Sequence, residues 1–275
     1  MFRHCDVRAC AICGGTDLSV ACEYRQPPKG EVAFVDAFEG GYRRSYFLCK
    51  GCGHFTADLE VDPRAFYIGN YVSGTYRDRE GLRRNFERIR SLPSELSDNI
   101  GRVRHVAGFV RRYCDQKNRA LKLLDIGAGL GVFPAAMKEE GFVCTALDPD
   151  PAVVEHLKGV VGVTAVGGVV EDVVGLGRFD VISLNKVLEH VNDPVKMLAR
   201  CRTFLEGGGC VYIELPDGEG AREEGFHREE FFLEHLHVFT CASVRILAER
   251  AGFRVLAVEK LREPSGKYTL RMFVH

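Results

Sequence analysis

The residues Leu121-Lys-Leu-Leu-Asp125-Ile-Gly127-Ala-Gly129-Leu-Gly131 dictate the architecture of this chain. Residues 121–126 form an apolar run of strand length, and the glycines after them indicate a tight turn that leads into a helix. Glycine lets the backbone of such a turn come close to a ligand. The pattern departs from the dinucleotide fingerprint G-x-G-x-x-G, since Gly131 comes one residue early and Val132 stands where the third glycine would be. An ordinary strand-to-helix connection is the alternative interpretation of the turn alone.

After this turn, strand-like and helix-like segments alternate, which indicates a parallel sheet covered on both faces. The last two strand-like segments are separated only by residues 262–267, a connection too short for a crossover helix. The last strand must therefore run antiparallel, and the sequence predicts a doubly wound α/β domain. Strands are expected at 121–126, 143–148, 163–166, 179–184, 209–215, 254–261 and 268–274, and helices at 131–141, 151–159, 194–205 and 241–252.

The carboxylate of Asp148 ends the second expected strand, roughly 20 residues beyond the glycine turn. In nucleotide-binding α/β folds an acidic side chain at this place accepts hydrogen bonds from the ribose hydroxyls. Turn and carboxylate together therefore favour a cofactor that contains adenosine.

Two copies of C-x-x-C-G stand near the start of the chain, at Cys10, Cys13 and Gly14 and at Cys49, Cys52 and Gly53. This spacing turns two thiolates onto one tetrahedral ion, and the glycine relieves the turn after the second cysteine. Four thiolates leave no coordination position for water or substrate, so the pattern predicts a structural Zn²⁺ rather than a catalytic one. Unliganded reduced thiols are the alternative, and the other possible ligands are Cys5, Cys22 and His54.

Charge and hydropathy exclude several classes of protein. The chain of 275 residues carries 37 Lys and Arg against 38 Asp and Glu, a net charge of −1, which disfavours a large nucleic-acid footprint. No apolar stretch approaches the roughly 20 residues that span a membrane. The first residues lack the apolar run and cleavage site of a secretory signal, so we expect a cytoplasmic location.

Further motifs follow the glycine turn in order: Asp148-Pro149, Phe179-Asp180, Val187-Leu-Glu189-His190-Val191 and Asp193-Pro194. With the turn they resemble the class I S-adenosylmethionine-dependent methyltransferases over about residues 120–260. The resemblance implies a seven-stranded Rossmann-like sheet with a reversed last strand, and S-adenosylmethionine as cofactor. It also implies which residues bind the cofactor. Asp148 with Pro149 would bind the ribose hydroxyls, Glu171 or Asp172 would face adenine, and Asn185 would lie near the sulfonium. The methionine and ribose would be lined by Asp125, Gly127, Ala128, Gly129 and Gly131.

The domain organisation expected from these features has three parts. Residues 1–60 form the zinc-binding module, resembling a zinc ribbon with an enlarged insert. Residues 61–118 form a linker. An aromatic-rich stretch at residues 55–78, which overlaps the end of the zinc-binding module, is expected to be an irregular loop. Connecting helices interrupted at Pro93 are expected to follow it. Residues 119–275 form the methyltransferase domain.

Methyl transfer from a sulfonium depends chiefly on positioning, so the base that deprotonates the acceptor is the informative residue. The segment 216–238 is the longest expected loop at the carboxyl edge of the sheet, where ligands bind. A glutamate beside a histidine can raise the basicity of the imidazole. The alternative for the histidines of this segment is that they only cap the following helix, which has Thr240 as its N-cap. The alternative for His190 is that it fixes the loop after the fourth strand. The candidate catalytic residues are His235, Glu234, His237, His190 and Tyr76.

The pair Glu234-His235, the four-cysteine module and the tyrosine-rich linker resemble the sugar C-methyltransferases. In that family such a pair and a linker tyrosine, here Tyr71 or Tyr76, surround a nucleotide-sugar substrate. Those enzymes continue into a further carboxyl-terminal domain that this sequence lacks, so the acceptor stays open. Three functions are therefore considered. The sequence favours a small-molecule methyltransferase acting on carbon, nitrogen or oxygen. The alternatives are an rRNA or tRNA base methyltransferase and a non-catalytic zinc-ribbon interaction protein.

Overall fold

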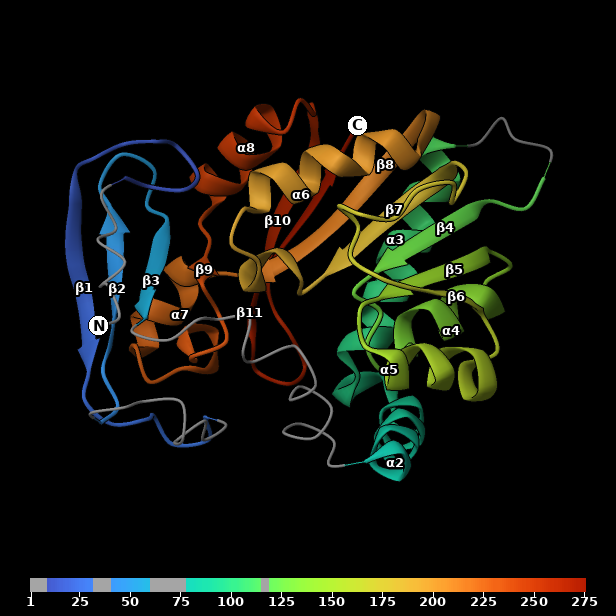
Figure 1. Ribbon diagram of the computed structural model, residues 1–275, viewed down its shortest axis with the longest axis horizontal. Helices are drawn as coiled ribbons and strands as arrows, with labels where there is room; N and C mark the ends of the chain where they lie inside the picture. The colour runs from blue at the N-terminus through green and yellow to red at the C-terminus, as the bar shows by residue number, and fades with distance from the viewer. Residues whose placement is uncertain (1–8, 32–40, 60–77, 115–118) are drawn as a thin grey trace.

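The computed structural model describes residues 9–31, 41–59, 78–114 and 119–275 and arranges them around two sheets (Figure 1). A four-stranded sheet has the order β1-β2-β3-β9, and a seven-stranded sheet has the order β10-β11-β8-β7-β4-β5-β6. Among these described residues no helix is both long and apolar enough to cross a membrane.

The seven-stranded sheet is the predicted α/β sheet. Its inner strands β5, β4, β7 and β8 run parallel, whereas β11 is antiparallel to both β8 and β10. The reversed last strand is therefore confirmed. The strands are β4 (Lys122–Ile126), β5 (Val143–Asp148), β6 (Thr164–Gly167), β7 (Phe179–Asn185), β8 (Leu205–Pro216), β10 (Val255–Arg262) and β11 (Tyr268–Val274).

Helices cover both faces of this sheet, as doubly wound folds require. Helices α6 and α8 pack on one face, and α2, α3, α4 and α5 pack on the other. Thr240 caps α8 in a reciprocal capping box with Ser243, which confirms the predicted N-cap. The helices are α2 (Arg79–Arg90), α3 (Asp98–Tyr113), α4 (Val132–Glu139), α5 (Pro151–His156), α6 (Pro194–Cys201), α7 (Gly218–Glu224) and α8 (Cys241–Arg250).

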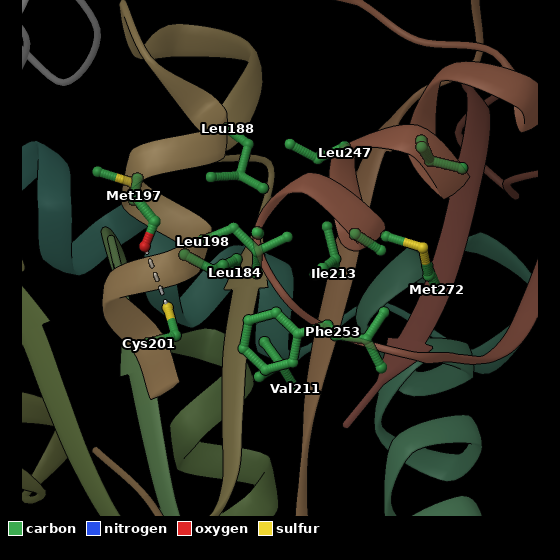
Figure 2. Close-up of a cluster of buried hydrophobic side chains, with 14 of the residues drawn as sticks. Leu184, Leu188, Met197, Leu198, Cys201, Val211, Ile213, Leu247, Phe253 and Met272 are labelled. Carbon is green, nitrogen blue, oxygen red and sulfur yellow. Dashed lines mark hydrogen bonds between the residues drawn. The ribbon is translucent and has the colours of Figure 1, made fainter. Parts of the chain in front are cut away.

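Figure 2 shows the core between α6, α8 and the sheet. Leu184 and Ile213 come from β7 and β8 and pack with Leu198 of α6 and Leu247 of α8, all of them fully buried. Each such side chain stabilises the fold by roughly 1.5–3 kcal/mol relative to its exposed state. This core fixes the strand ends at which the site lies.

The four-stranded sheet is assembled from both ends of the chain. Strands β1 (Leu18–Tyr24), β2 (Arg44–Cys49) and β3 (Phe55–Leu59) form an antiparallel meander. Its fourth strand is β9 (His237–Val238), which pairs antiparallel with β3 through Phe55 and Val238. The N-terminal sheet therefore includes part of the segment after β8.

Five sequence expectations need correction. The helix expected at 194–205 ends at Cys201, because a 3-10 turn at 202–204 leads directly into β8. Strand β8 starts at Leu205 instead of 209, since a bulge opposite Phe179 and Val181 accommodates Gly207–Gly209. The helix expected at 151–159 becomes a π-helical turn from Leu157. The irregular loop expected from residue 55 begins as strand β3, and 216–238 contains α7, a 3-10 turn and β9 rather than one loop.

Candidate active site

The glycine turn after β4 combines tight packing with one open position. Gly127, Gly129 and Gly131 all have left-handed φ values, of +68°, +50° and +71°. A Cβ at Gly127 would lie 2.7 Å from a methyl of Val187, and one at Gly131 would lie 2.6 Å from Leu157. A Cβ at Gly129 would meet no atom within 4 Å. The first and third glycines are thus required by packing, and the second exposes backbone to a ligand.

Asp148 ties the end of β5 to this turn. Its carboxylate accepts hydrogen bonds from the backbone N–H groups of Gly129 and Asp150, both at 3.0 Å. Burial raises the pKa of Asp148, and the two amides oppose that shift. Half-buried Ala128 and exposed Pro149 flank these groups. The structure therefore brings the predicted carboxylate to the predicted turn.

Asp125 and Asn185 form the centre of this edge of the sheet. The Asp125 carboxylate accepts hydrogen bonds from Ser183 Oγ at 2.6 Å and Asn185 Nδ2 at 3.0 Å. Burial raises the pKa of Asp125 to about 7. Within the described part of the chain, the Oδ1 atom of Asn185 is buried without a hydrogen-bond partner. An orphaned acceptor beside exposed backbone fits a cofactor that carries an ammonium and a sulfonium group.

The two candidates for the adenine contact lie together in the turn after β6. Glu171 is half-buried and Asp172 is exposed, with its N–H donating to the Val169 carbonyl at 3.1 Å. Both residues follow β6, the strand that pairs with β5. The adenine contact of Glu171 or Asp172 stays a prediction.

A second group of polar side chains lies where β7 ends. Glu189 and His190 belong to the 3-10 turn after β7, and His235 comes from the segment after β8. One ligand-capable atom of each lies within 4.8 Å of the others, and the two imidazole centroids are 5.0 Å apart. His190 Nδ1 is 2.8 Å from the Glu234 carbonyl, and His235 Nδ1 is 2.8 Å from the Glu230 carbonyl. A carbonyl only accepts, so both rings carry their proton on Nδ1 when neutral.

Burial controls the protonation of this cluster. It raises the pKa of Glu189 to about 8, and neither oxygen of this fully buried carboxyl has a hydrogen-bond partner among the residues that the structure describes. Burial and the neighbouring His190 lower the pKa of His235 well below its usual value. The expected increase of imidazole basicity by an adjacent glutamate is therefore wrong. At neutral pH His235 is an unprotonated imidazole.

His237 lies apart from this cluster. It belongs to β9, where its Nδ1 is 3.0 Å from His54 Nε2 and the two rings stack. Burial lowers the pKa of His237 to about 4. The predicted tyrosines, Tyr71 and Tyr76, lie outside the described residues.

The four cysteines of the two knuckles meet at the end of the N-terminal sheet. The Sγ atoms of Cys10 and Cys52 are 3.6 Å apart, those of Cys13 and Cys49 are 3.5 Å apart, and all four lie within 4.8 Å. A tetrahedral Zn²⁺ with four thiolates places the sulfurs about 3.8 Å apart. The residues therefore fit the ion that the spacing predicts.

Backbone geometry supports the same cluster. Gly14 and Gly53, which follow the second cysteine of each knuckle, have φ values of +74° and +72°. The expected role of glycine in the two turns is confirmed. Of the alternative ligands, His54 contacts His237, Cys22 contacts the Glu23 carbonyl, and Cys5 lies outside the described residues.

Sequence reasoning missed several residues around the site. Glu214 in β8 is fully buried and accepts from Arg102 Nε at 2.7 Å, and Lys186 has a left-handed backbone. A charge within the apolar run of residues 210–216 was the signal for Glu214. Glu31 and Tyr46 of the N-terminal region also contact the segment that carries His235. No local signal indicates such long-range contacts.

Comparisons with known proteins agree with this geometry. Residues 83–258 match the family model described as a methyltransferase domain. The ubiquinone biosynthesis O-methyltransferase of Vibrio parahaemolyticus is 32% identical over 34% of this chain and 42% of its own length. The protein of the same name from Pectobacterium carotovorum is 30% identical over 46% of this chain and 58% of its own length. The chain thus spans about half the length of these curated relatives.

A solved structure shows the same fold over most of the chain. The 1,6-didemethyltoxoflavin-N1-methyltransferase of Burkholderia thailandensis, with bound S-adenosylhomocysteine, superposes with a TM-score of 0.53. The match covers 84% of this chain and 94% of that one, at 20% sequence identity. Because the family model covers residues 83–258, more than half of the sequence, the chain belongs to the methyltransferase-domain family.

Proposed function

We propose that this protein transfers the methyl group of S-adenosylmethionine to a small-molecule acceptor at the carboxyl edge of the seven-stranded sheet. One observation carries the proposal: the open glycine turn and the Glu189–His190–His235 cluster lie at the same edge. Val187 connects them, because it packs against Gly127 and stands two residues before Glu189. A cofactor on the turn and an acceptor at the cluster would therefore be neighbours.

S-Adenosylmethionine supplies an electrophilic methyl group when bound. The backbone at Gly129 and the carboxylate of Asp148 support the proposed ribose site. Asp125 and the orphaned Oδ1 of Asn185 support the site for the methionine end. Positioning by these groups supplies most of the rate enhancement in a displacement of this kind.

His235 is the proposed base. Its neutral imidazole can accept the acceptor's proton at Nε2, while the Glu230 carbonyl accepts from Nδ1–H and stabilises the imidazolium that forms. His190 contacts the Glu234 carbonyl and positions the same segment. His237 is proposed as a structural residue of the N-terminal sheet, and Tyr76 keeps its predicted place near the acceptor.

The four cysteines are proposed to bind one structural Zn²⁺. The sulfur separations and the left-handed glycines support this role. The knuckles also dock on the larger domain, since Arg250 donates to the Ile12 carbonyl at 2.6 Å and Thr240 Oγ1 donates to the Cys52 carbonyl at 2.9 Å. The metal would therefore fix the module against α8.

A small acceptor is favoured over RNA by the net charge of −1, because phosphate contacts require a basic surface. The test uses methyl-tritiated S-adenosylmethionine with a panel of hydroxylated aromatics, amines, nucleoside-diphosphate sugars and other secondary metabolites, alongside tRNA and rRNA. Hydroxylated acceptors are included in the panel because the curated relatives are named O-methyltransferases. We expect label to be transferred to a small acceptor, at a rate that does not depend on the salt concentration. Tight retention and labelling of RNA that weaken steeply with salt would overturn the proposal.

A further inference from the structure

The backbone that carries His235 lies between two parts of the molecule (Figure 1). On the side of the cofactor edge, the N–H of Leu236 donates to the Glu189 carbonyl at 2.7 Å. On the opposite side, the carbonyl of Leu236 accepts from the N–H of Ala57 in β3 at 2.9 Å. The N-terminal sheet and the turn after β7 therefore contact one and the same residue next to His235.

Tyr46 of β2 contacts His235 directly. Its hydroxyl lies 2.5 Å from the His235 carbonyl and 3.2 Å from the Phe232 carbonyl, and the whole side chain is buried. Burial raises the pKa of Tyr46, so the hydroxyl keeps its proton and donates it. The hydroxyl of Tyr46 thus fixes the peptide group that follows the imidazole-bearing carbon.

Glu31 fixes the same segment two residues earlier. Its Oε2 atom accepts from the N–H of Leu233 at 2.8 Å and from Arg44 Nη2 at 2.7 Å. The side chains of Glu31 and Arg44 are fully buried, and Tyr42 donates to the other oxygen of Glu31. A buried ion pair adds little net stability, but it fixes the position of what it binds. Here it binds the backbone that leads to His235.

Both contacts depend on β2, the strand that leads to the cysteine cluster. Arg44 and Tyr46 alternate along β2 and therefore lie on one face of the sheet. Strand β2 ends at Cys49, three residues beyond Tyr46. The knuckle that begins at Cys49 closes the hairpin between β2 and β3, so a fixed knuckle also fixes the strand that presents Tyr46.

We propose that Tyr46 and the Glu31–Arg44 pair are positioning residues, which fix the His235 backbone from the N-terminal sheet so that its imidazole meets Glu189 and His190. The inference rests on the proposed function, in which His235 accepts the acceptor's proton. It gives the N-terminal module a role in the reaction although none of these three residues touches the cofactor turn.

The test compares Tyr46→Phe with Tyr24→Phe in the full chain. Each change removes one hydroxyl that donates to a backbone carbonyl of the same segment, since Tyr24 donates to the Phe226 carbonyl at 2.6 Å. Only the Tyr46 contact is at His235. With the acceptor that the wild type methylates in the panel, we expect kcat of Y46F to fall about 10-fold to 100-fold, with cofactor affinity unchanged. Y24F should retain wild-type kcat and a similar melting temperature.

A second readout needs no acceptor. In protein labelled with ¹³C at histidine Cε1, His235→Ala identifies the His235 signal. Its titration reports an imidazole whose protonated form is disfavoured by burial, by His190 and by the positive charges of Lys186 and Lys267, with the Glu189 carboxyl within 4.8 Å. We expect Y46F to move the His235 midpoint toward the ordinary value near 6.5, and Y24F to leave it unchanged.

The outcomes separate the two proposals. If the wild type labels no small acceptor, the proposed function fails, and the titration still decides whether Tyr46 positions His235. If Y46F matches Y24F in both kcat and titration, the positioning role is wrong, whatever the acceptor is. A loss of kcat without any change of the His235 signal would also overturn it.

Discussion

The two sheets of this protein are stabilised by different means. Strand β7 of the seven-stranded sheet is buried along most of its length and packs under α6 and α8. The four-stranded sheet contains a fully buried ion pair between Arg44 and Glu31, a histidine pair and four clustered thiols. The large sheet therefore rests mainly on an extensive apolar core, although it also buries the Glu214–Arg102 pair. The small sheet combines a smaller aromatic cluster with specific polar contacts.

This difference shows how the small sheet depends on the large one. Strand β9 has only two residues, and it reaches β3 because the chain between β8 and α8 passes along the N-terminal strands. A sheet of this size buries too little apolar surface to fold alone without a metal or a partner. The N-terminal module and the segment that carries His235 are therefore one structural unit, and each prediction below tests a part of that unit.

The largest effect is expected from Cys10→Ser, which removes one of four thiolates. Apparent binding energies of structural Zn²⁺ are about 10–16 kcal/mol, so loss of the metal should unfold the N-terminal sheet. The seven-stranded sheet should stay folded, because its core lies between α6, α8 and the strands. Metal analysis by mass spectrometry measures the loss of Zn²⁺, and hydrogen exchange measures the unfolding. In C10S, protection should be lost in β1–β3 and in residues 226–238.

Cys22→Ser is the matched control, since Cys22 lies in β1 outside the cluster. It should keep one Zn²⁺ per chain and the exchange pattern of the wild type. If C10S retains full protection of β2 and β3, or if the wild-type protein contains no metal, the four thiols are packed side chains and the small sheet does not depend on an ion.

The next effect is expected from His235→Ala, which removes the proposed base but keeps the backbone contacts of the segment. Loss of a general base costs about 10²–10⁴ in turnover. Cofactor affinity should not change, because His235 clusters with Glu189 and His190, where the acceptor is proposed to bind. Single-turnover rates and calorimetry separate these two quantities. His227→Ala, at an exposed position of the same segment, is the control, and full activity of H235A would remove it as the base.

The contrast between the sheets also explains which features the sequence could predict. Strands β4 to β8 and the reversed β11 follow from local patterns, because each is an apolar run of strand length and the connection between β10 and β11 is too short for a helix. Strand β9 has no such pattern: two residues within a polar segment pair with a strand some 180 positions earlier. Periodicity carries no information about a pairing of that range.

The candidate site divides along the same line. The glycine turn and Asp148 lie close in sequence and are predicted from spacing, and the role of Asp125 is implied by the family resemblance. Glu189-His190 and Glu234-His235 were also identified, but only the fold shows that they meet. The basicity of His235 was misjudged because the adjacent glutamate is visible in the sequence and the burial of the imidazole is not.

A smaller effect is expected from Asp148→Ala, which tests the edge of the large sheet. Losing a charged hydrogen bond costs about 1.5–3 kcal/mol, a loss of cofactor affinity of about 10-fold to 100-fold. Calorimetry with S-adenosylmethionine measures it. Glu155→Ala removes an exposed carboxylate from nearby α5 and should bind as the wild type does. Unchanged affinity in D148A would exclude Asp148 from the ribose site.

The smallest expected effect is the pH dependence of cofactor binding through Asp125. Burial raises the pKa of this carboxyl to about 7, so the free protein retains a proton there that an exposed aspartate would release near pH 4. A bound cation favours the carboxylate and lowers this pKa. Affinity for S-adenosylmethionine should therefore rise as the pH increases through 7 and level off above it. A fall of one pKa unit on binding corresponds to at most about tenfold.

Asp125→Asn is the matched variant, because it keeps the size of the side chain and removes the titration. Its cofactor affinity should be lower than that of the wild type above pH 7 and flat between pH 6 and 8. Calorimetry in buffers of different ionisation enthalpy should show proton release on binding to the wild type and none to D125N. The same slope in both proteins would assign the pH dependence to another group. A slope that disappears with Asp125 would assign the pH dependence of cofactor binding to this single carboxyl at the edge of the large sheet.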